Sequence, residues 1–122
     1  MPFIIVDTSS IIFGLSNKKD VFEAVRNHQR AYSPIISEGI IRELKLIRER
    51  HEKYSKFAGA ALLLISMAHV EITKDSSSVD EWIKKEAVGK GYAVCTNDTA
   101  LKRSLKTAKI RVFSMTRSGT LR

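Results

Sequence analysis

The chain has 122 residues, of which 43% are apolar and 28% charged, and this composition predicts one globular domain with its own core. It carries 21 Lys and Arg against 13 Asp and Glu, and the formal net charge of +8 favours a polyanionic partner such as nucleic acid. The single Cys95 excludes an intramolecular disulfide and a cysteine-rich zinc site. No apolar run approaches the roughly 18 residues of a membrane span, and residues 1–6 lack the basic segment of a signal peptide. We therefore expect a cytoplasmic protein with no membrane partner.

The first apolar run, Phe3 to Val6, does not alternate with polar residues, which is typical of a strand buried on both faces of a parallel sheet. We expect it to be the central strand. Asp7 follows it directly, and ligands of open α/β sheets bind beyond the carboxyl ends of the strands. Asp7 is therefore a candidate metal ligand. The alternative is that Asp7, Thr8 or Ser9 merely caps the helix that follows.

Two helices are predicted between residues 11 and 28, and Asp20 is suited to cap the second. Residues 31–33 predict a second strand that ends at Pro34, because proline discourages helix in the residue before it.

The next predicted helix, from Ser37 to Arg50, carries an acid on its apolar side. At 100° per residue, Glu43 falls between Leu46 and Ile47. An unpaired buried carboxylate is costly, so it protonates or finds a cation. Glu43 is therefore expected either to bind a metal ion or to form a buried ion pair with a Lys or Arg.

Residues 57–67 are apolar almost all round, which predicts a helix that is central to the core or half in a dimer interface. We expect a homodimer. Residues 70–73 alternate as a short strand does.

The C-terminal half continues the alternation of helix and strand. The expected elements are a helix from Val79 ended by Gly89 and Gly91, a strand at residues 92–95, a helix that contains Leu101 and Leu105, and a strand at residues 110–113. We expect the domain to span residues 1–116 and residues 117–122 to form a frayed tail.

Strands that alternate with helices imply a parallel sheet with right-handed crossovers, which places every strand-to-helix junction at one edge. Asp7 and Asp98 each follow a strand, Asp80 lies in the first turn of a helix that begins at this edge, and Glu43 lies in the second turn of another. Four acids clustered in a basic protein repel one another unless a hard divalent cation holds them, and oxygen ligands suit Mg²⁺ or Mn²⁺. The competing explanation is that Asp7, Asp80 and Asp98 are three independent helix caps.

The motif Asp80-x2-Ile83-x3-Ala87-x3-Gly91-x4-Thr96-Asn97-Asp98-x2-Leu101 resembles the C-terminal half of the PIN domain family of metal-dependent ribonucleases. Ile5-Val6-Asp7-Thr8-Ser9 is similar to the family's first strand, and Ile41-Arg42-Glu43-Leu44 to its glutamate helix. The likeness runs from about Phe3 to Thr116. The resemblance assigns the family's acidic quartet to Asp7, Glu43, Asp80 and Asp98, with Thr96 and Ser9 as supporting hydroxyls. Glu81 and Glu86 compete with Asp80 for the third position.

The resemblance implies a three-layer αβα fold with a central parallel sheet of about five strands in the order 3-2-1-4-5. It also implies hydrolysis of RNA phosphodiester bonds with one or two Mg²⁺ or Mn²⁺ ions. Both a toxin of a toxin–antitoxin pair and a ribosomal-RNA-processing enzyme fit, so an antitoxin or a ribosome-related protein joins RNA among the expected partners. The alternative is a non-catalytic PIN-like module that binds RNA or protein. A flavodoxin-like nucleotide or phosphoacceptor domain is disfavoured, because the six glycines form no Gly-x-Gly-x-x-Gly fingerprint.

Overall fold

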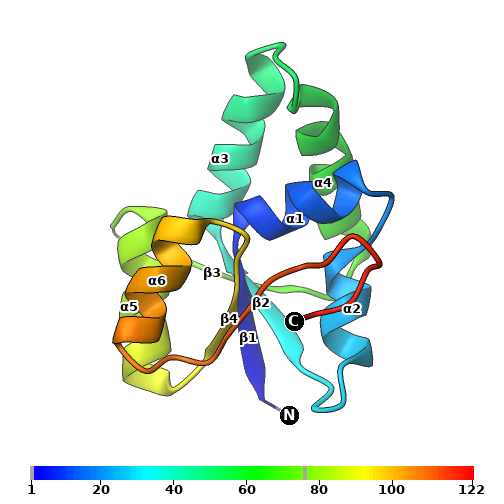
Figure 1. Ribbon diagram of the computed structural model, residues 1–122. Coiled ribbons are helices and arrows are strands. Elements are labelled where there is room, and N and C mark those ends of the chain that lie inside the picture. The colour runs from blue at the N-terminus through cyan, green and yellow to red at the C-terminus, as the bar shows by residue number, and fades with distance from the viewer. Residues whose placement is uncertain (1, 76) are drawn as a thin grey trace.

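The computed structural model describes residues 2–75 and 77–122 (Figure 1). Helices and strands alternate along the chain, as the sequence predicts. In order they are β1 (Phe3–Val6), α1 (Thr8–Ser16), α2 (Val21–Asn27), β2 (Ser33–Ser37), α3 (Glu38–Glu49), α4 (Ser55–Met67), β3 (Glu71–Thr73), α5 (Val79–Lys90), β4 (Ala93–Cys95), α6 (Thr99–Thr107) and β5 (Val112–Phe113).

The strands form one parallel sheet of five, in the order β3-β2-β1-β4-β5. The central strand is β1, where Ile5 pairs with Ile35 of β2 on one side and with Val94 of β4 on the other. Ile4, Ile5 and Val6 are fully buried, as expected for a strand covered on both faces. The predicted strand order and the central place of β1 are confirmed.

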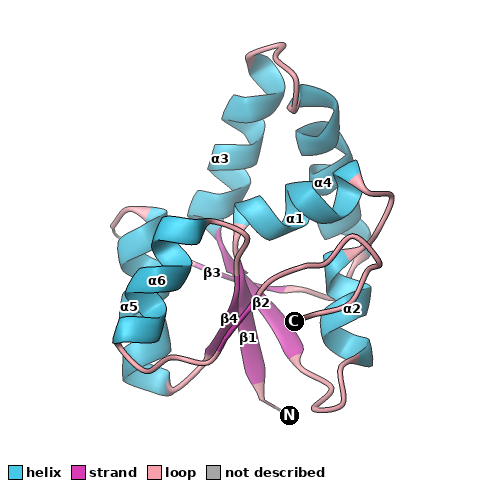
Figure 2. Cartoon of the chain, in the orientation of Figure 1, coloured by secondary structure: helices cyan, strands magenta, loops and turns pink. Residues whose placement is uncertain are grey.

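Helices cover both faces of the sheet, which gives three layers (Figures 1 and 2). Right-handed crossovers place α1 to α4 on one face and α5 with α6 on the other, because the chain reverses its direction across the sheet after β3. The pair α3 and α4 projects beyond the carboxyl ends of the strands (Figure 1). The sheet edge below this projection is where the expected site lies.

The second strand differs from the sequence-based prediction. It does not end at Pro34 but continues through it to Ser37. Proline is tolerated here because it is the second residue of β2, and pairing with β3 begins only at Ile35.

Two further boundaries differ from those expected. Gly89 lies inside α5, and Gly91 alone ends the helix, with a φ of +70° that suits glycine. Residues 117–122, for which the sequence predicts a frayed tail, turn back in the structure. Met115 pairs with Leu121 in an antiparallel bridge, and Ser114 and Arg122 exchange two backbone hydrogen bonds of 2.9 Å. The domain boundary at residue 116 stays a prediction.

Helix α4 divides into a buried and an exposed side. Ala58, Ala61 and Ile65 lie in the core, whereas Leu63 and Met67 leave 63% and 69% of their surface exposed. Across residues 2–75 and 77–122, no helix has the length and apolar character that crossing a membrane requires.

Candidate functional site

A pocket of about 430 Å³ opens at the carboxyl edge of the sheet. Four acids line it, each from a different part of the chain: Asp7 after β1, Glu43 on α3, Asp80 on α5 and Asp98 after β4. The other lining residues are polar, apolar or aromatic: Thr8, Ser9, Ile12, Phe13, Ser16, Ile47, Tyr54 and Asn97. In the part of the chain that the structure describes, no Lys, Arg or His lines this pocket, although the net charge of the protein is +8. We call it the acid pocket.

Asp7 is buried at the junction of β1 and α1. It occupies the cap position of α1, but its side chain makes no capping hydrogen bond. Instead its Oδ2 accepts hydrogen bonds from Ser9 Oγ (2.7 Å) and Thr96 Oγ1 (2.8 Å). Burial raises the pKa of the Asp7 carboxyl above its ordinary value, the two hydroxyls counteract part of this rise, and the charge of Asp80 adds to it. For Asp7, helix capping is therefore not the role of the side chain.

The two expected supporting hydroxyls, Ser9 and Thr96, are held in place by the backbone that follows β4. The Asn97 N–H donates to Ser9 Oγ (2.9 Å), and the Asp98 N–H donates to Thr96 Oγ1 (3.1 Å). Each hydroxyl can therefore direct its own hydrogen at Asp7. This arrangement fixes the orientation of the Asp7 carboxylate at the floor of the acid pocket.

Glu43 is half-buried on α3. Burial raises the pKa of its carboxyl, and so do the charges of Asp7 and Asp80, while the nearby Thr8 hydroxyl lowers it somewhat. The ion pairs within residues 2–75 and 77–122 are Arg42 with Asp75 and Lys90 with Glu86, and neither includes Glu43. The buried ion pair that was the alternative for Glu43 is therefore not found there.

Asp80 lies in the first turn of α5 but does not cap it. Ser78 is the cap, and its Oγ accepts a hydrogen bond from the Glu81 N–H (3.3 Å). Glu81 is exposed and Glu86 pairs with Lys90 at 3.1 Å, and neither lines the acid pocket. Of the three competing acids on α5, only Asp80 belongs to the site.

Asp98 lines the acid pocket and also caps a helix. Its Oδ1 accepts a hydrogen bond from the Leu101 N–H (3.0 Å), so it caps α6 as the competing explanation holds. The charge of Asp80 raises the pKa of both the Asp7 and the Glu43 carboxyl. Asp7, Glu43 and Asp80 therefore repel one another, and the exposed Asp98 lies at the rim of the acid pocket.

The acidic side chains of the pocket do not form a compact three-ligand metal site. Among the residues that the structure describes, no three carboxylate, imidazole or thiol groups lie close enough to hold one metal ion between them. The close approach of Asp7, Glu43 and Asp98 that a single ion would need is therefore not present.

The chemistry of the donors nevertheless fits a hard divalent cation. Asp7 and Glu43 are at least half-buried, repel one another, and have no basic neighbour at the pocket. Thr8 Oγ1 is a buried hydroxyl that makes no hydrogen bond of good geometry. Anionic and hydroxyl oxygens of this kind are the ligands that Mg²⁺ and Mn²⁺ prefer.

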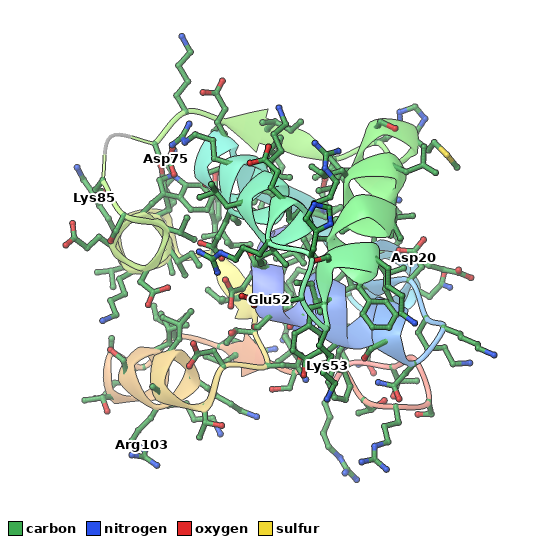
Figure 3. All side chains as sticks on the ribbon, turned by 90° about the horizontal axis from the view of Figure 1, so that it is seen from above. Asp20, Glu52, Lys53, Asp75, Lys85 and Arg103 are labelled. Atoms are coloured by element: carbon green, nitrogen blue, oxygen red, sulfur yellow. The ribbon has the colours of Figure 1, made fainter. Side chains whose placement is uncertain are left out.

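Asp75 is a structural part of the site that the sequence did not reveal. Its buried carboxylate accepts hydrogen bonds from Ser37 Oγ and Arg42 Nη2, both at 3.0 Å. It thereby ties the loop before α5 to the start of α3 (Figure 3), with Gly39 packed against it because a side chain there would collide with the carboxylate. Nothing local in the sequence signals a contact between residues so far apart.

Asn97 is a second residue that the sequence did not single out. Its side chain exchanges two hydrogen bonds of 3.0 Å with the backbone of Met115, and its Oδ1 also accepts from Ser10 Oγ (2.6 Å). It therefore holds the C-terminal segment against the start of α1. The position of Asn97 inside the Thr96-Asn97-Asp98 motif was the sequence feature that could have pointed to it.

Comparison with known proteins agrees with this architecture. A family model described as a PIN like domain matches residues 4–118. Among solved structures, the PIN domain endonuclease Utp24 is similar, with 27% sequence identity and a TM-score of 0.75 over 93% of this chain and 85% of that chain. A domain of a functionally unknown protein from Methanocaldococcus jannaschii shares the fold, with 16% identity and a TM-score of 0.68 over 95% of this chain and 92% of that one. None of the curated proteins matches the sequence significantly.

Proposed function

Because the chain belongs to the PIN-like domain family, we propose that it is a metal-dependent endoribonuclease that hydrolyses phosphodiester bonds of RNA. The observation that carries the proposal is the acid pocket, which Asp7, Glu43, Asp80 and Asp98 line, with no basic side chain among the described lining residues. The likeness to an endonuclease that covers 93% of the chain supports the same reaction class.

The residues of the acid pocket take distinct roles in this proposal. Asp7, Glu43 and Asp80 would hold Mg²⁺ or Mn²⁺ singly or in pairs, with water as the remaining ligands, because no three described acids lie close enough for one ion. Asp98 would assist from the rim of the pocket. When bound, the cation lowers the pKa of a water molecule and stabilises negative charge on the phosphate. Ser9 and Thr96 orient the Asp7 carboxylate through hydrogen bonds to its Oδ2.

The side chains around the acid pocket suit the binding of single-stranded RNA. Tyr54 lines it with 46% of its surface exposed, and Phe13 lines it as well. Aromatic rings stack on unpaired bases. Lys53 lies beside Tyr54, with its Nζ 5.4 Å from the ring centroid, and would contact the RNA backbone.

The test is cleavage of a labelled single-stranded RNA in Mn²⁺ and in chelator. We expect cleavage only with the metal, and a loss of about 100-fold or more in Asp7→Asn and Asp80→Asn, the range seen when one group that stabilises transition-state charge is removed. Glu81→Gln is the matched control, because it removes the same charge one residue away from the pocket. Cleavage in chelator, or an Asp80→Asn variant as active as the control, would refute the proposal.

A non-catalytic module that binds RNA or protein is the second candidate. It is favoured by the absence, among the described residues, of three ligands close enough to hold one ion. This candidate predicts that the parent binds RNA and leaves it intact in Mn²⁺, whereas the enzyme cuts it.

The biological setting is part of the proposal. An antitoxin partner predicts a small reading frame directly upstream, and a ribosome-related partner predicts co-sedimentation with ribosomal particles. The exposed Leu63 and Met67 of α4 support a homodimer. Sedimentation at micromolar concentration tests it, and a monomer would refute it.

A further inference from the structure

A second cleft, of about 370 Å³, lies at the opposite edge of the sheet, where the strands begin. Residues at or just before the first residues of β1, β2, β4 and β5 form its walls, close to the N terminus marked in Figure 1. Basic and aromatic residues dominate its lining, with Arg30, Lys90, Arg111, Phe3 and Tyr92 prominent among them. No acid lines it in the part of the chain that the structure describes. We call it the basic cleft.

Its cations come from three separate segments, two loops and the last residue of α5. Arg30 precedes β2, Arg111 precedes β5, and both are exposed. Neither forms an ion pair within residues 2–75 and 77–122. Lys90, in contrast, pairs with Glu86 at 3.1 Å and extends toward the ring of Tyr92, 5.8 Å away. The two arginines are therefore the cations available to an anionic ligand.

Aromatic rings also line the basic cleft. Phe3 and Tyr92 are half-buried, with centroids 5.4 Å apart and planes tilted by 53°. Cations that follow a phosphate backbone, combined with rings that stack on bases, are the components of sites for single-stranded nucleic acid. A nucleotide segment matches both parts of this lining, whereas a phosphate alone would leave the rings unused.

We propose that the basic cleft binds a segment of single-stranded RNA, with Arg30 and Arg111 on its phosphates and Tyr92 against a base. The choice of RNA rests on the proposed function. The site itself is separate from the acid pocket, because Phe3 and Asp7 stand at opposite ends of β1, about 13 Å apart at 3.3 Å per residue.

Anisotropy of a labelled single-stranded RNA in chelator, at low salt, isolates this site. Without a metal ion the acid pocket repels RNA, and no cleavage disturbs the measurement. We expect the double variant Arg30→Gln, Arg111→Gln to bind about tenfold more weakly than the parent. The slope of log K against log[salt] should become shallower by about 1.4, or 0.7 for each lost phosphate contact on a single strand.

The matched control is Lys84→Gln, Lys85→Gln, which removes the same charge from exposed positions of α5 outside the cleft; Lys85 points away from the fold in Figure 3. It should bind within about twofold of the parent. If control and cleft variants lose equal affinity, only net charge matters and the proposal is overturned. If neither variant loses affinity, it is overturned as well.

Tyr92→Leu tests the ring while keeping an apolar contact with Phe3. We expect about a fivefold or greater loss of RNA affinity, the lower bound for one stacked base, and unchanged binding of heparin, a polyanion without bases. Unchanged RNA binding would mean a general polyanion site and would overturn the proposal. Since binding is measured without metal, a failure of the proposed nuclease activity appears in the cleavage assay and leaves this result standing.

Discussion

Glu43→Gln tests whether the acids form one coupled group. The substitution keeps the shape of the side chain but removes a charge that the charges of Asp7 and Asp80 repel. In the folded protein this charge is disfavoured by burial and by its two neighbours, which together raise the pKa of the Glu43 carboxyl. We therefore predict that the variant is more stable than the parent in chelator.

The expected gain is about 1 kcal/mol. Optimised charges commonly stabilise a protein by about 0.5–2 kcal/mol, and because Glu43 is only half-buried, solvent screening excludes the upper part of this range. For a domain of 122 residues, this corresponds to an increase in Tm of about 4 °C.

The effect depends on pH with a defined sign. The ordinary pKa of the carboxyl is 4.5 and the folded-state pKa is higher, so the folded protein binds more protons than the unfolded chain between these two values. The parent therefore loses stability as the pH rises through this window. The advantage of Glu43→Gln should be full at pH 8 and disappear near pH 4.

Thermal melts in chelator and in Mn²⁺ provide the measurement. Mn²⁺ should raise the Tm of the parent and leave that of Glu43→Gln unchanged. Glu49→Gln on the same helix is the control, because it removes an exposed charge outside the acid pocket; it should stay within about 0.5 kcal/mol of the parent and keep the response to Mn²⁺. A Glu43→Gln variant that melts well below the parent in chelator would show that Glu43 is structural and would refute the coupled site.

Asp98→Asn should keep the cap of α6 and the stability of the parent but lose RNA cleavage, whereas Asp98→Ala should also lose about 1 kcal/mol of stability. Melts and cleavage assays check this, and a fully active Asp98→Asn would reduce Asp98 to a cap. Gly39→Ala should destabilise the protein by about 2 kcal/mol, because its methyl group overlaps the Asp75 carboxylate; an unchanged Tm would contradict the packing. Cys95 is buried and its pKa is raised to about 12, so it should resist alkylation at pH 8 until the protein is unfolded. Rapid labelling of the native protein would contradict its burial.

Much of this protein follows from local sequence. The apolar run before Asp7, which does not alternate with polar residues, predicts a central strand covered on both faces, and Asp20 is predicted to be a cap that the structure contains. Because parallel crossovers are right-handed, alternation of helix and strand is enough to bring all strand-to-helix junctions to one edge. The meeting of Asp7, Glu43, Asp80 and Asp98 at one pocket could therefore be predicted without coordinates.

Tertiary structure decided what each acid does there. Local sequence treats Asp7, Asp80 and Asp98 as equivalent helix-start acids, but only Asp98 caps with its side chain, because Asp7 is bound by Ser9 and Thr96 and Ser78 caps α5. Pro34 inside β2 is acceptable only because pairing with β3 begins one residue later. Asp75 reaches Ser37 and Arg42 across more than 30 positions of sequence. These hydrogen bonds depend on which side chains lie close together in the folded protein. The periodicity of a sequence does not encode the distances between residues that are far apart along the chain.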